Sequence, residues 1–282
     1  MNSYIKELAK LILPEYFIIT ISTILTASLF NNYFSITLLS LIIIFTLVMI
    51  GLNTFNSLYD IHIDKLNKPN RPNVSGKIQK KTINFIWISS FLLSIGLAFT
   101  ISLNIAILTI TGVIIAIAYS IPPIRLRSHF VSSSFVGGFT YGAFPYLLVT
   151  FTSTNQLNFS HLLLFFGILF AITPLKDIED VYGDKKNKIK SFPVLFGEIK
   201  TINFTTIQLI IINLLFLIFN ITNTILLFPF FMSIIIVYNL NRFSKILLTK
   251  NYRHTTQSTI VTLAMISVII IELLYGTLLF FT

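Results

Sequence analysis

The chain has 282 residues, of which 55% are hydrophobic and 11% are charged, and its mean hydropathy is +0.85. A soluble globular protein has about 25% charged residues, so the composition excludes that class and predicts a protein that crosses the membrane several times. The net charge of +10 is attributed to membrane topology rather than to nucleic-acid binding. The absence of cysteine excludes disulfides, zinc–thiolate sites and iron–sulfur clusters.

Apolar runs of about 18 to 25 residues are long enough to span a bilayer as helices, and nine of them can be recognised. We therefore predict an all-α bundle of nine transmembrane helices that forms one domain over residues 1–282. No cleavable signal peptide is expected, because Lys6, Glu7 and Lys10 come before the first run. The predicted helices cover residues 11–30, 36–59, 82–102, 104–121, 132–153, 159–176, 202–220, 223–240 and 258–280.

The distribution of lysine and arginine predicts the orientation of these helices. All 20 lie at the N-terminus, in or beside alternate connections, or on helix ends that face those connections. Cytoplasmic loops of membrane proteins carry an excess of basic residues. We therefore expect a multi-pass protein of the cell membrane with a cytoplasmic N-terminus and an external C-terminus. The connections without a basic residue are 31–35, 102–104, 154–160 and 221–222, together with the tail 281–282.

A polar stripe follows the second apolar run, and we name residues 56–64 the first acidic segment. Asn56, Asp60 and Asp64 recur in it at intervals of four residues. On one helix, with a rise of 1.5 Å per residue, they would form a stripe about 12 Å long. Asn53, just before the segment, is included as a candidate for substrate binding.

A second group of carboxylates follows the sixth run, and we name residues 177–184 the second acidic segment. It contains Asp177, Asp180 and Asp184. The equivalent places of the two segments suggest a four-helix unit used twice and followed by a ninth helix. Because Mg²⁺ prefers oxygen ligands and is often held by carboxylates together with phosphates, the segments predict a cytoplasmic-side magnesium site for a phosphate-bearing substrate. The alternative is that these residues are solvated helix ends.

Basic residues beside the acidic segments are candidates for binding the phosphates. Arg71 lies in a proline-rich loop after the first segment, with Lys68, and its guanidinium could hold phosphate oxygens through two donors. Lys176 immediately precedes the second segment. Tyr119 and Arg125 flank a diproline that should end the fourth helix, which would place the Tyr119 hydroxyl towards a cavity. An interfacial anchor is the alternative role for this tyrosine, and positive-inside topology is the alternative for most of the lysines.

The fifth run contains glycines and a proline within residues 137–146, which predicts close helix packing and a kink beside an apolar groove. Glu15 and Glu272 are the carboxylates expected inside the bilayer, where charged residues usually face a cavity. Glu15 is expected near the cytoplasmic site, and Glu272 is expected to be structural.

These motifs resemble the UbiA superfamily of intramembrane prenyltransferases. The first signature of the superfamily is matched by Asn56, Asp60 and Asp64, and the second by the run from Lys176 to Asp184. Its loops are matched by Lys68-Pro-Asn-Arg-Pro72, Ser75-Gly76, Tyr119-Ser and Pro122-Pro123, so the resemblance covers most of the chain.

The resemblance implies a nine-helix fold and Mg²⁺-dependent transfer of a prenyl chain from a polyprenyl diphosphate to a lipophilic acceptor. No nucleic acid and no obligate protein partner are expected. The implied metal ligands are Asp60, Asp64, Asp180 and Asp184, with Asp177 as a further candidate. Diphosphate contact is implied for Asn56, Arg71 and Lys176, and Asn53, Lys68 and Arg125 are added as substrate-binding candidates. Tyr119 is the candidate for stabilising the allylic cation or positioning the acceptor.

The acceptor is predicted less directly, because different motifs resemble different branches of the superfamily. Residues 119–125 and 63–69 are similar to the homogentisate branch, and residues 138–145 to chlorophyll synthases. The run 176–180 is similar to archaeal digeranylgeranylglyceryl phosphate synthases. A quinone-type or other aromatic acceptor is the leading hypothesis, and the ether-lipid synthase is the alternative. An ion-coupled transporter is a remote alternative, because its acids should lie near the membrane midplane.

Overall fold

The computed structural model describes residues 3–12, 15–249 and 253–280, and these residues form helices and no strand. They include seven helices long and apolar enough to cross a membrane, and an eighth if the bent pair Tyr4–Ile12 and Phe17–Phe30 counts as one span. The fifth predicted stretch consists of three consecutive short segments, none of which is long enough by itself. The predicted helical membrane bundle is confirmed, whereas the number nine stays a prediction.

The elements are α1 (Ser3–Ile12), α2 (Glu15–Phe30), α3 (Thr37–Tyr59), α4 (Ile61–Asn67), α5 (Lys80–Ile101), α6 (Leu103–Ser120), η1 (Leu126–Ser128), α7 (Phe130–Gly137), η2 (Gly138–Ala143), α8 (Phe144–Ser153), α9 (Phe159–Lys176), η3 (Asp177–Asp180), α10 (Val181–Lys186), α11 (Phe192–Phe196), α12 (Glu198–Phe219), η4 (Thr224–Leu226), α13 (Leu227–Thr249) and α14 (Arg253–Phe280).

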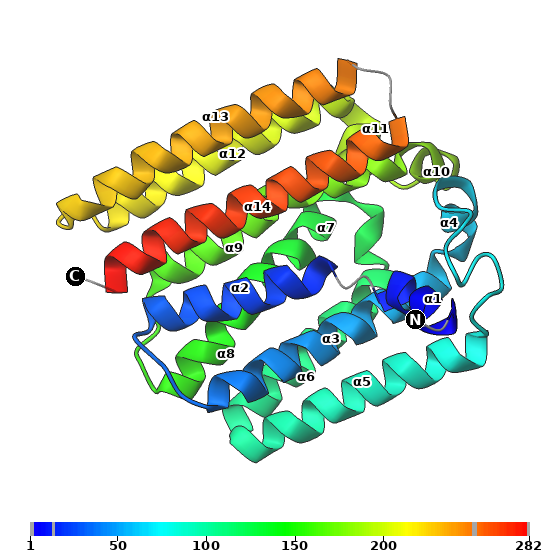
Figure 1. The fold of residues 1–282 in the computed structure, drawn as a ribbon, viewed down its shortest axis with the longest axis horizontal. Helices are drawn as coiled ribbons and strands as arrows, with labels where there is room; N and C mark the ends of the chain where they lie inside the picture. The colour runs from blue at the N-terminus through cyan, green and yellow to red at the C-terminus, as the bar shows by residue number, and fades with distance from the viewer. Residues whose placement is uncertain (1–2, 13–14, 250–252, 281–282) are drawn as a thin grey trace.

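The long helices lie side by side, and the short helices α4, α10 and α11 lie together at one end of the bundle (Figure 1). Helix α3 contacts α5 and α6, whereas α9 contacts α12 and the π-helical segment η2. Helix α14 contacts α2, α9 and α13, which brings the last helix beside the first long one. Helix α4 also contacts α10, although they are more than 100 residues apart in the chain. This contact brings the two acidic segments to the same end of the bundle.

Glycines in the fifth predicted stretch allow η2 and α7 to lie directly against α9. Gly142 faces the backbone of Phe165, and Gly137 faces Thr173, so that a Cβ atom at either glycine would overlap these neighbours. Pro145 lies in the first turn of α8, which continues directly from η2. The predicted close packing is confirmed, and the irregularity in this stretch is the π-helical turn of η2.

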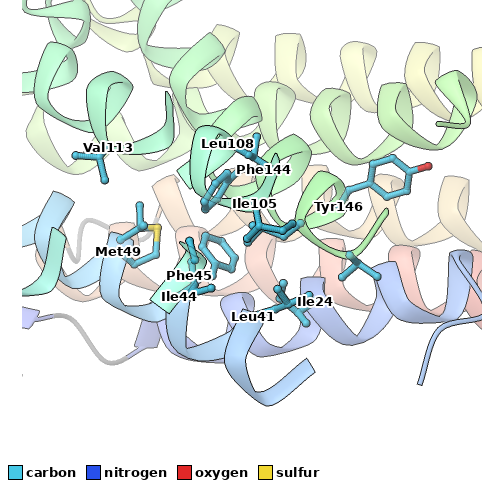
Figure 2. Close-up of a cluster of buried hydrophobic side chains, with 14 of the residues drawn as sticks. Ile24, Leu41, Ile44, Phe45, Met49, Ile105, Leu108, Val113, Phe144 and Tyr146 are labelled. Carbon is cyan, nitrogen blue, oxygen red and sulfur yellow. The ribbon is translucent and has the colours of Figure 1, made fainter. Parts of the chain in front are cut away.

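Two groups of buried apolar side chains fill the bundle. One lies among α2, α3, α6 and α8 and includes Phe45 and Phe144, whose rings meet edge to face at 5.7 Å (Figure 2). The other lies among α9, α12, α13 and α14 and includes Phe216 and Tyr275, whose ring centroids are 4.9 Å apart. The core therefore extends along the length of the helices and leaves the polar end to the short elements.

Large apolar side chains also point outwards from the bundle. On α5, Phe85, Leu92 and Phe99 recur at intervals of seven residues and are all more than half exposed. This spacing places them on one face of the helix. A continuous apolar face is unfavourable in water and favourable against lipid. Together with the span lengths, it identifies the protein as a multi-pass membrane protein.

Candidate active site

The first acidic segment spans the junction between α3 and α4. Asp60 joins the two helices with φ −93° and ψ 7°, which are not helical values. The backbone N–H of Asp60 donates to the carbonyl of Asn56 at 3.0 Å, and that of Asp64 donates to the carbonyl of Asp60 at 2.8 Å. The prediction of one helical stripe is therefore wrong in this respect. Because the helix breaks at Asp60, the three side chains are carried by two helices.

The second acidic segment is also irregular. Helix α9 ends at Lys176, two residues after its internal Pro174, and the chain continues as the 3₁₀ turn η3 and then as α10. Asp177 and Asp180 begin and end η3, and Asp184 lies in α10. The six polar residues of the two segments thus all lie on helix ends or short helices at the same end of the bundle.

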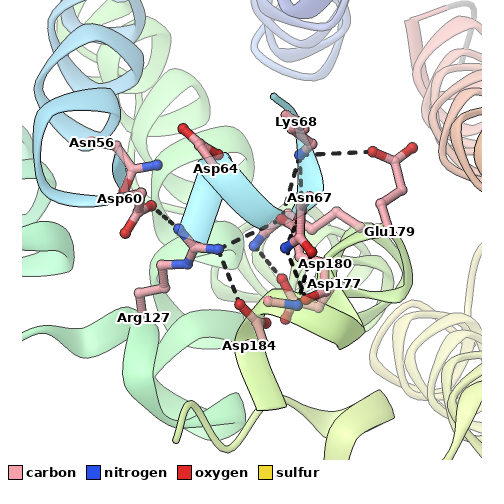
Figure 3. Close-up of polar contacts among 12 residues, drawn as sticks. Asn56, Asp60, Asp64, Asn67, Lys68, Arg127, Asp177, Glu179, Asp180 and Asp184 are labelled. Carbon is pink, nitrogen blue, oxygen red and sulfur yellow. Dashed lines mark hydrogen bonds and ion pairs between the residues drawn. The ribbon is translucent and has the colours of Figure 1, made fainter. Parts of the chain in front are cut away.

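Arg127 lies between the two acidic segments and connects them (Figure 3). Its guanidinium pairs with Asp60 of the first segment, and it lies 3.5 Å from the carboxylate of Asp180 and 3.4 Å from that of Asp184. Backbone hydrogen bonds of 2.9 Å and 3.1 Å between residues 128–130 and Lys190 hold the arginine loop beside the loop after α10. The side chain of Arg127 is only 8% exposed, so it is a buried counter-ion for three carboxylates.

Sequence reasoning missed Arg127 and named Arg125 instead. Arg125 does pair with Asp60, at 3.0 Å, but its backbone has φ +31° and its side chain does not line the cavity. The signal that could have pointed to Arg127 is a second arginine two positions later, in the loop between the two acidic segments.

Cations from the loop after α4 hold the remaining carboxylates. Arg71 donates to Asp64 at 2.7 Å within the first half of the chain. Lys68 reaches across to the second segment, where its ammonium lies 3.1 Å from Asp180 and 3.8 Å from Glu179. Burial raises the pKa of Asp64 above its ordinary value, although Arg71 and Lys68 oppose this shift. The carboxylates are therefore drawn together by basic groups at a partly dehydrated site.

Further contacts place the other predicted residues. The Lys176 ammonium donates to the Tyr119 hydroxyl at 3.1 Å and to the Asp177 carboxylate at 2.6 Å. The amide oxygen of Asn56 accepts a 3.0 Å hydrogen bond from the Ser120 hydroxyl. The side chain of Glu15 lies outside the described residues. Glu272 is fully buried in α14, where its carboxylate oxygens have no hydrogen-bond partner.

A cavity of about 760 Å³ begins at this cluster and runs between the helices. Its polar end is lined by residues of both acidic segments and their cations, and its apolar end by α2 and α14, including Ile19, Met265 and Ile269. Ile18 and Ile266 also line it and are 65% and 48% exposed, so the cavity has an open flank between these two helices. The cavity thus combines an ionic end with a wall exposed to the lipid-facing surface.

The cavity separates the predicted site residues into two groups. Those that line it are Asn53, Asn56, Asp64, Lys68, Arg71, Tyr119, Lys176 and Asp180. Those that do not are Asp60, Asp177, Asp184 and Arg125. In each acidic segment one of the predicted aspartates therefore faces the cavity, Asp64 or Asp180, and another lies beneath it in contact with Arg127. Glu179 of the second segment lines the cavity as well.

The donor set can be tested against the preferences of Mg²⁺. Among the described residues no three or more carboxylate, histidine or cysteine side chains are arranged to hold a metal ion on their own. Mg²⁺ needs only one or two carboxylates when phosphate oxygens and water complete its coordination. Asp64 and Asp180 offer such oxygens from opposite sides of the cavity, beside Asn56. The residues present therefore fit a magnesium ion that binds together with a phosphate group.

A family model for the UbiA prenyltransferase family matches residues 16–278. The digeranylgeranylglyceryl phosphate synthase of Methanosphaera stadtmanae is 35% identical over 163 residues, which are 56% of this chain and 57% of the relative. The synthase of the same name from Methanobrevibacter smithii is 30% identical over 76% of this chain and 75% of the relative. The bacteriochlorophyll synthase 33 kDa chain of Rhodobacter capsulatus is 29% identical over 50% of this chain and 49% of its own length. The chain thus spans just over half the length of the M. stadtmanae relative that it matches.

Solved structures share the fold at lower identity. A structure described as digeranylgeranylglyceryl phosphate synthase in membranes has a TM-score of 0.70 at 20% identity, with 99% of this chain and 100% of that chain covered. A UbiA homologue from Archaeoglobus fulgidus, solved with GPP and Mg²⁺, has a TM-score of 0.71 at 16% identity, with 98% and 100% covered. The arrangement of helices seen here is therefore shared with these membrane proteins.

Proposed function

Because the chain belongs to the UbiA prenyltransferase family, we propose that it acts as a digeranylgeranylglyceryl phosphate synthase. In this reaction the hydroxyl oxygen of geranylgeranylglyceryl phosphate attacks the first carbon of geranylgeranyl diphosphate. A carbon–oxygen ether bond forms, the bond to the diphosphate breaks, and the acceptor hydroxyl loses its proton. The enzyme class is that of the family, a prenyltransferase, and the acceptor is the part that the proposal adds.

The single observation that carries the proposal is the two-ended cavity. Its ionic end contains carboxylates from both acidic segments, and its apolar end is walled by α2 and α14. A prenyl diphosphate has the same division between a highly charged group and a long hydrocarbon chain. The exposed flank at Ile18 and Ile266 offers such a chain a route from the lipid phase.

The chain's own residues have distinct roles in this proposal. Arg71, Lys68 and Lys176 bind diphosphate oxygens, since all three line the ionic end as cations. Asn53 and Asn56 orient the bound group through their amides. Tyr119 faces the reacting carbon, where its ring stabilises developing positive charge and the apolar wall excludes water. Arg125 lies behind this layer and keeps Asp60 in place.

Asp60, Asp64, Asp180 and Asp184 would hold Mg²⁺, which when bound neutralises the departing diphosphate as a Lewis acid. Asp64 and Asp180 are the carboxylates on the cavity surface. Asp60 and Asp184 lie beneath the cavity surface. Their carboxylates would contribute to holding Mg²⁺ once Arg127 turns its donors from them towards the phosphates. Asp177 is assigned instead to fixing Lys176, because the two side chains are 2.6 Å apart.

Two observations support a phosphorylated acceptor over an aromatic one. Relatives that match 56% and 76% of the chain carry the name of the ether-lipid synthase. The cavity is also rich in cations, because Lys10, Lys68, Arg71, Arg127 and Lys176 line it together with the acids Asp64, Glu179 and Asp180. An acceptor with its own phosphate uses these additional cations. The order of the two hypotheses is therefore reversed from that expected from the sequence, and the transporter is not retained.

The proposal includes a cytoplasmic active site. Lysines of the loops after α4 and α10 lie at the same end of the bundle as the two acidic segments. Cytoplasmic loops carry the excess of basic residues, which supports a cytoplasmic N-terminus and an external C-terminus. Mg²⁺ and soluble diphosphate are both accessible on that side.

The test is an acceptor comparison with the purified full-length protein in lipid vesicles. Geranylgeranyl diphosphate and Mg²⁺ are supplied with geranylgeranylglyceryl phosphate, homogentisate or a chlorophyllide, and the products are identified by mass spectrometry. We expect a doubly prenylated glyceryl phosphate with the first acceptor, no product with the other two, and no turnover when EDTA removes the metal ion.

If product forms only with an aromatic acceptor, the proposed acceptor is wrong, whereas the proposed prenyl transfer still holds. If no acceptor yields a product and no diphosphate is released, the proposed chemistry is wrong for this chain. An Asp180→Asn variant, expressed and inserted to the same level, is the control for diphosphate released by contaminating enzymes.

A further inference from the structure

Asn67, the last residue of α4, joins the two acidic segments through its side-chain amide. Its oxygen accepts a 2.8 Å hydrogen bond from the backbone N–H of Gly183. Its nitrogen donates to the backbone carbonyl of Asp180 at 3.0 Å and to the carboxylate of the same residue at 3.3 Å. The residue is 8% exposed. Both ends of one buried amide are thus engaged by the opposite half of the chain.

The opposite half is shaped to receive this amide. Gly183 lies directly against it, and a Cβ atom there would come within 2.5 Å of its nitrogen and 2.7 Å of its oxygen. The position therefore requires glycine, even though its place in α10 makes no unusual demand on the backbone. The fit between Asn67 and Gly183 fixes how closely α4 approaches α10.

Asn67 also lies close to Asp64 along the chain. The two residues belong to the same short helix, and the backbone N–H of Lys68 donates to the carbonyl of Asp64 at 2.7 Å. Since Asp64 and Asp180 are the aspartates of their segments that line the cavity, this amide sets the position of one carboxylate relative to the other.

The other links between the segments are ion pairs. Lys68 and Arg127 both contact Asp180, and both line the cavity in which the diphosphate is proposed to bind. These cations exchange carboxylate for phosphate when the substrate enters. The hydrogen bonds of Asn67 need no such exchange, because they use backbone groups and one edge of the Asp180 carboxylate.

We infer that Asn67 is a positioning residue that holds the Asp180 carboxylate opposite Asp64, at the separation needed to bind a divalent cation with the diphosphate. The inference rests on the proposed function for the identity of the ligand. It assigns to Asn67 an action through Asp180, without contact to the reacting atoms.

The test compares two substitutions at Asn67 that differ in shape. Asn67→Ala removes all three hydrogen bonds, whereas Asn67→Asp keeps the shape and the acceptor for Gly183 but loses the donor to Asp180. Residues that orient metal ligands typically contribute about 10–100-fold to metal affinity or activity. We expect both variants to weaken Mn²⁺ binding, measured by electron paramagnetic resonance with inorganic diphosphate present, by about tenfold or more. The half-saturating Mg²⁺ concentration for product formation should rise in parallel.

Asn73→Ala is the matched control. Asn73 is a buried asparagine in the following loop, and it donates to the carbonyl of Ser57 at 2.6 Å instead of to a carboxylate of either segment. Loosening this loop should leave the Mn²⁺ affinity within about twofold of the unmodified protein, since Asn73 does not line the cavity.

Asn67→Asp keeps the shape of the side chain and places a negatively charged oxygen where the donor to Asp180 was. An Asn67 that positions Asp180 therefore predicts weaker binding, whereas a role that does not reach Asp180 predicts Mn²⁺ binding as tight as in the unmodified protein. That result, or unchanged binding in Asn67→Ala, would overturn the inference. If Asn67→Ala does not fold, Asn67→Asp alone decides between the outcomes. A failure of the proposed function is a different result, because the unmodified protein would then release no diphosphate with any acceptor.

Discussion

The two acidic segments place their carboxylates at the cavity in the same way, and they obtain their counter-ions differently. Each has one predicted aspartate on the cavity surface, Asp64 or Asp180, and one beneath it in contact with Arg127, Asp60 or Asp184. Asp64 is paired with Arg71 from its own half of the chain. Asp180 depends on groups from the first half, among them Lys68 and Asn67. The first half therefore organises both sides of the site.

This asymmetry indicates which perturbations stay local. Removing a residue of the second segment leaves the first with its counter-ions, because Asp64 and Arg71 are only seven residues apart. Removing Arg127, which contacts carboxylates of both segments, disturbs buried charge on both sides. The following predictions rank substitutions by how far they disturb the pairing of the two segments.

The largest effect is expected from the carboxylates on the cavity surface. Asp64→Asn and Asp180→Asn each remove one charge that would hold Mg²⁺ against the diphosphate, and metal ions supply several kcal/mol of charge stabilisation in the transition state. We expect product formation to fall by about a thousandfold or more in either variant. The measurement is the initial rate of diphosphate release in vesicles that contain equal amounts of inserted protein.

The two variants sharpen the comparison between the segments. If the two carboxylates are equivalent as ligands, the fold decrease in the rate of product formation should agree within about tenfold between the two variants. Full activity in one of them would show that the segment concerned does not hold the metal ion.

The next largest effect is expected from the counter-ion of the two aspartates that lie beneath the cavity. Asp60 and Asp184 share Arg127 as this counter-ion. Arg127→Gln leaves Asp184 buried without its cation and leaves Asp60 with Arg125 alone, and removing one partner of a buried ion pair costs about 3–5 kcal/mol. We expect a lower midpoint of thermal unfolding in detergent, together with loss of activity. Combining it with Asp184→Asn should restore part of the stability, since one unpaired charge is then removed. A single variant that unfolds at the same temperature as the unmodified protein would contradict this view of Arg127.

Much of this site was predictable, because the spacing of the acids and their places after apolar runs are local features of the chain. The cavity-facing positions of Asp64, Arg71 and Tyr119 follow from those features. The roles of Asn67 and Arg127 do not. Their contacts join residues 57 to 116 positions apart, and neither belongs to the spaced set of acids that identified the segments. The packing of α4 against α10 brings Asn67 to its partners, and the backbone hydrogen bonds between residues 128–130 and Lys190 hold Arg127 beside the second segment.

The helix count shows a similar limit of sequence reasoning. Hydropathy reports how apolar a stretch is, and all nine predicted stretches contain helix. It does not report where the backbone changes its hydrogen-bonding pattern. The π-helical turn of η2 divides the fifth predicted stretch. The second predicted helix ends where α3 does, and the break at Asp60 interrupts only the predicted polar stripe.

A smaller effect is expected from exchanging the cations that contact the cavity-facing carboxylates. Arg71→Lys keeps the charge but loses the planar pair of donors, and a hydrogen bond to a charged group contributes about 1.5–3 kcal/mol. We expect KM for the prenyl diphosphate to rise by about 10–100-fold, with a smaller change in kcat.

Lys68→Ala should raise KM by less, because the Lys68 side chain is 40% exposed and its pairs are screened by solvent. The first half supplies the counter-ion of its own carboxylate, because Arg71 pairs with Asp64. A larger rise of KM in Lys68→Ala than in Arg71→Lys would contradict this assignment.

The smallest effect is expected at Asp177, the carboxylate that the sequence suggested as a further metal ligand. Asp177 does not line the cavity, and its carboxylate holds the Lys176 ammonium at 2.6 Å. In Asp177→Asn the amide oxygen still accepts from Lys176, which also keeps its bond to Tyr119. We therefore expect activity to fall by less than about tenfold, and the Mg²⁺ concentration for half-maximal activity to stay unchanged. A shift of that concentration as large as in Asp180→Asn would mean that Asp177 binds the metal ion directly, and the second segment would then contribute one more ligand than the first.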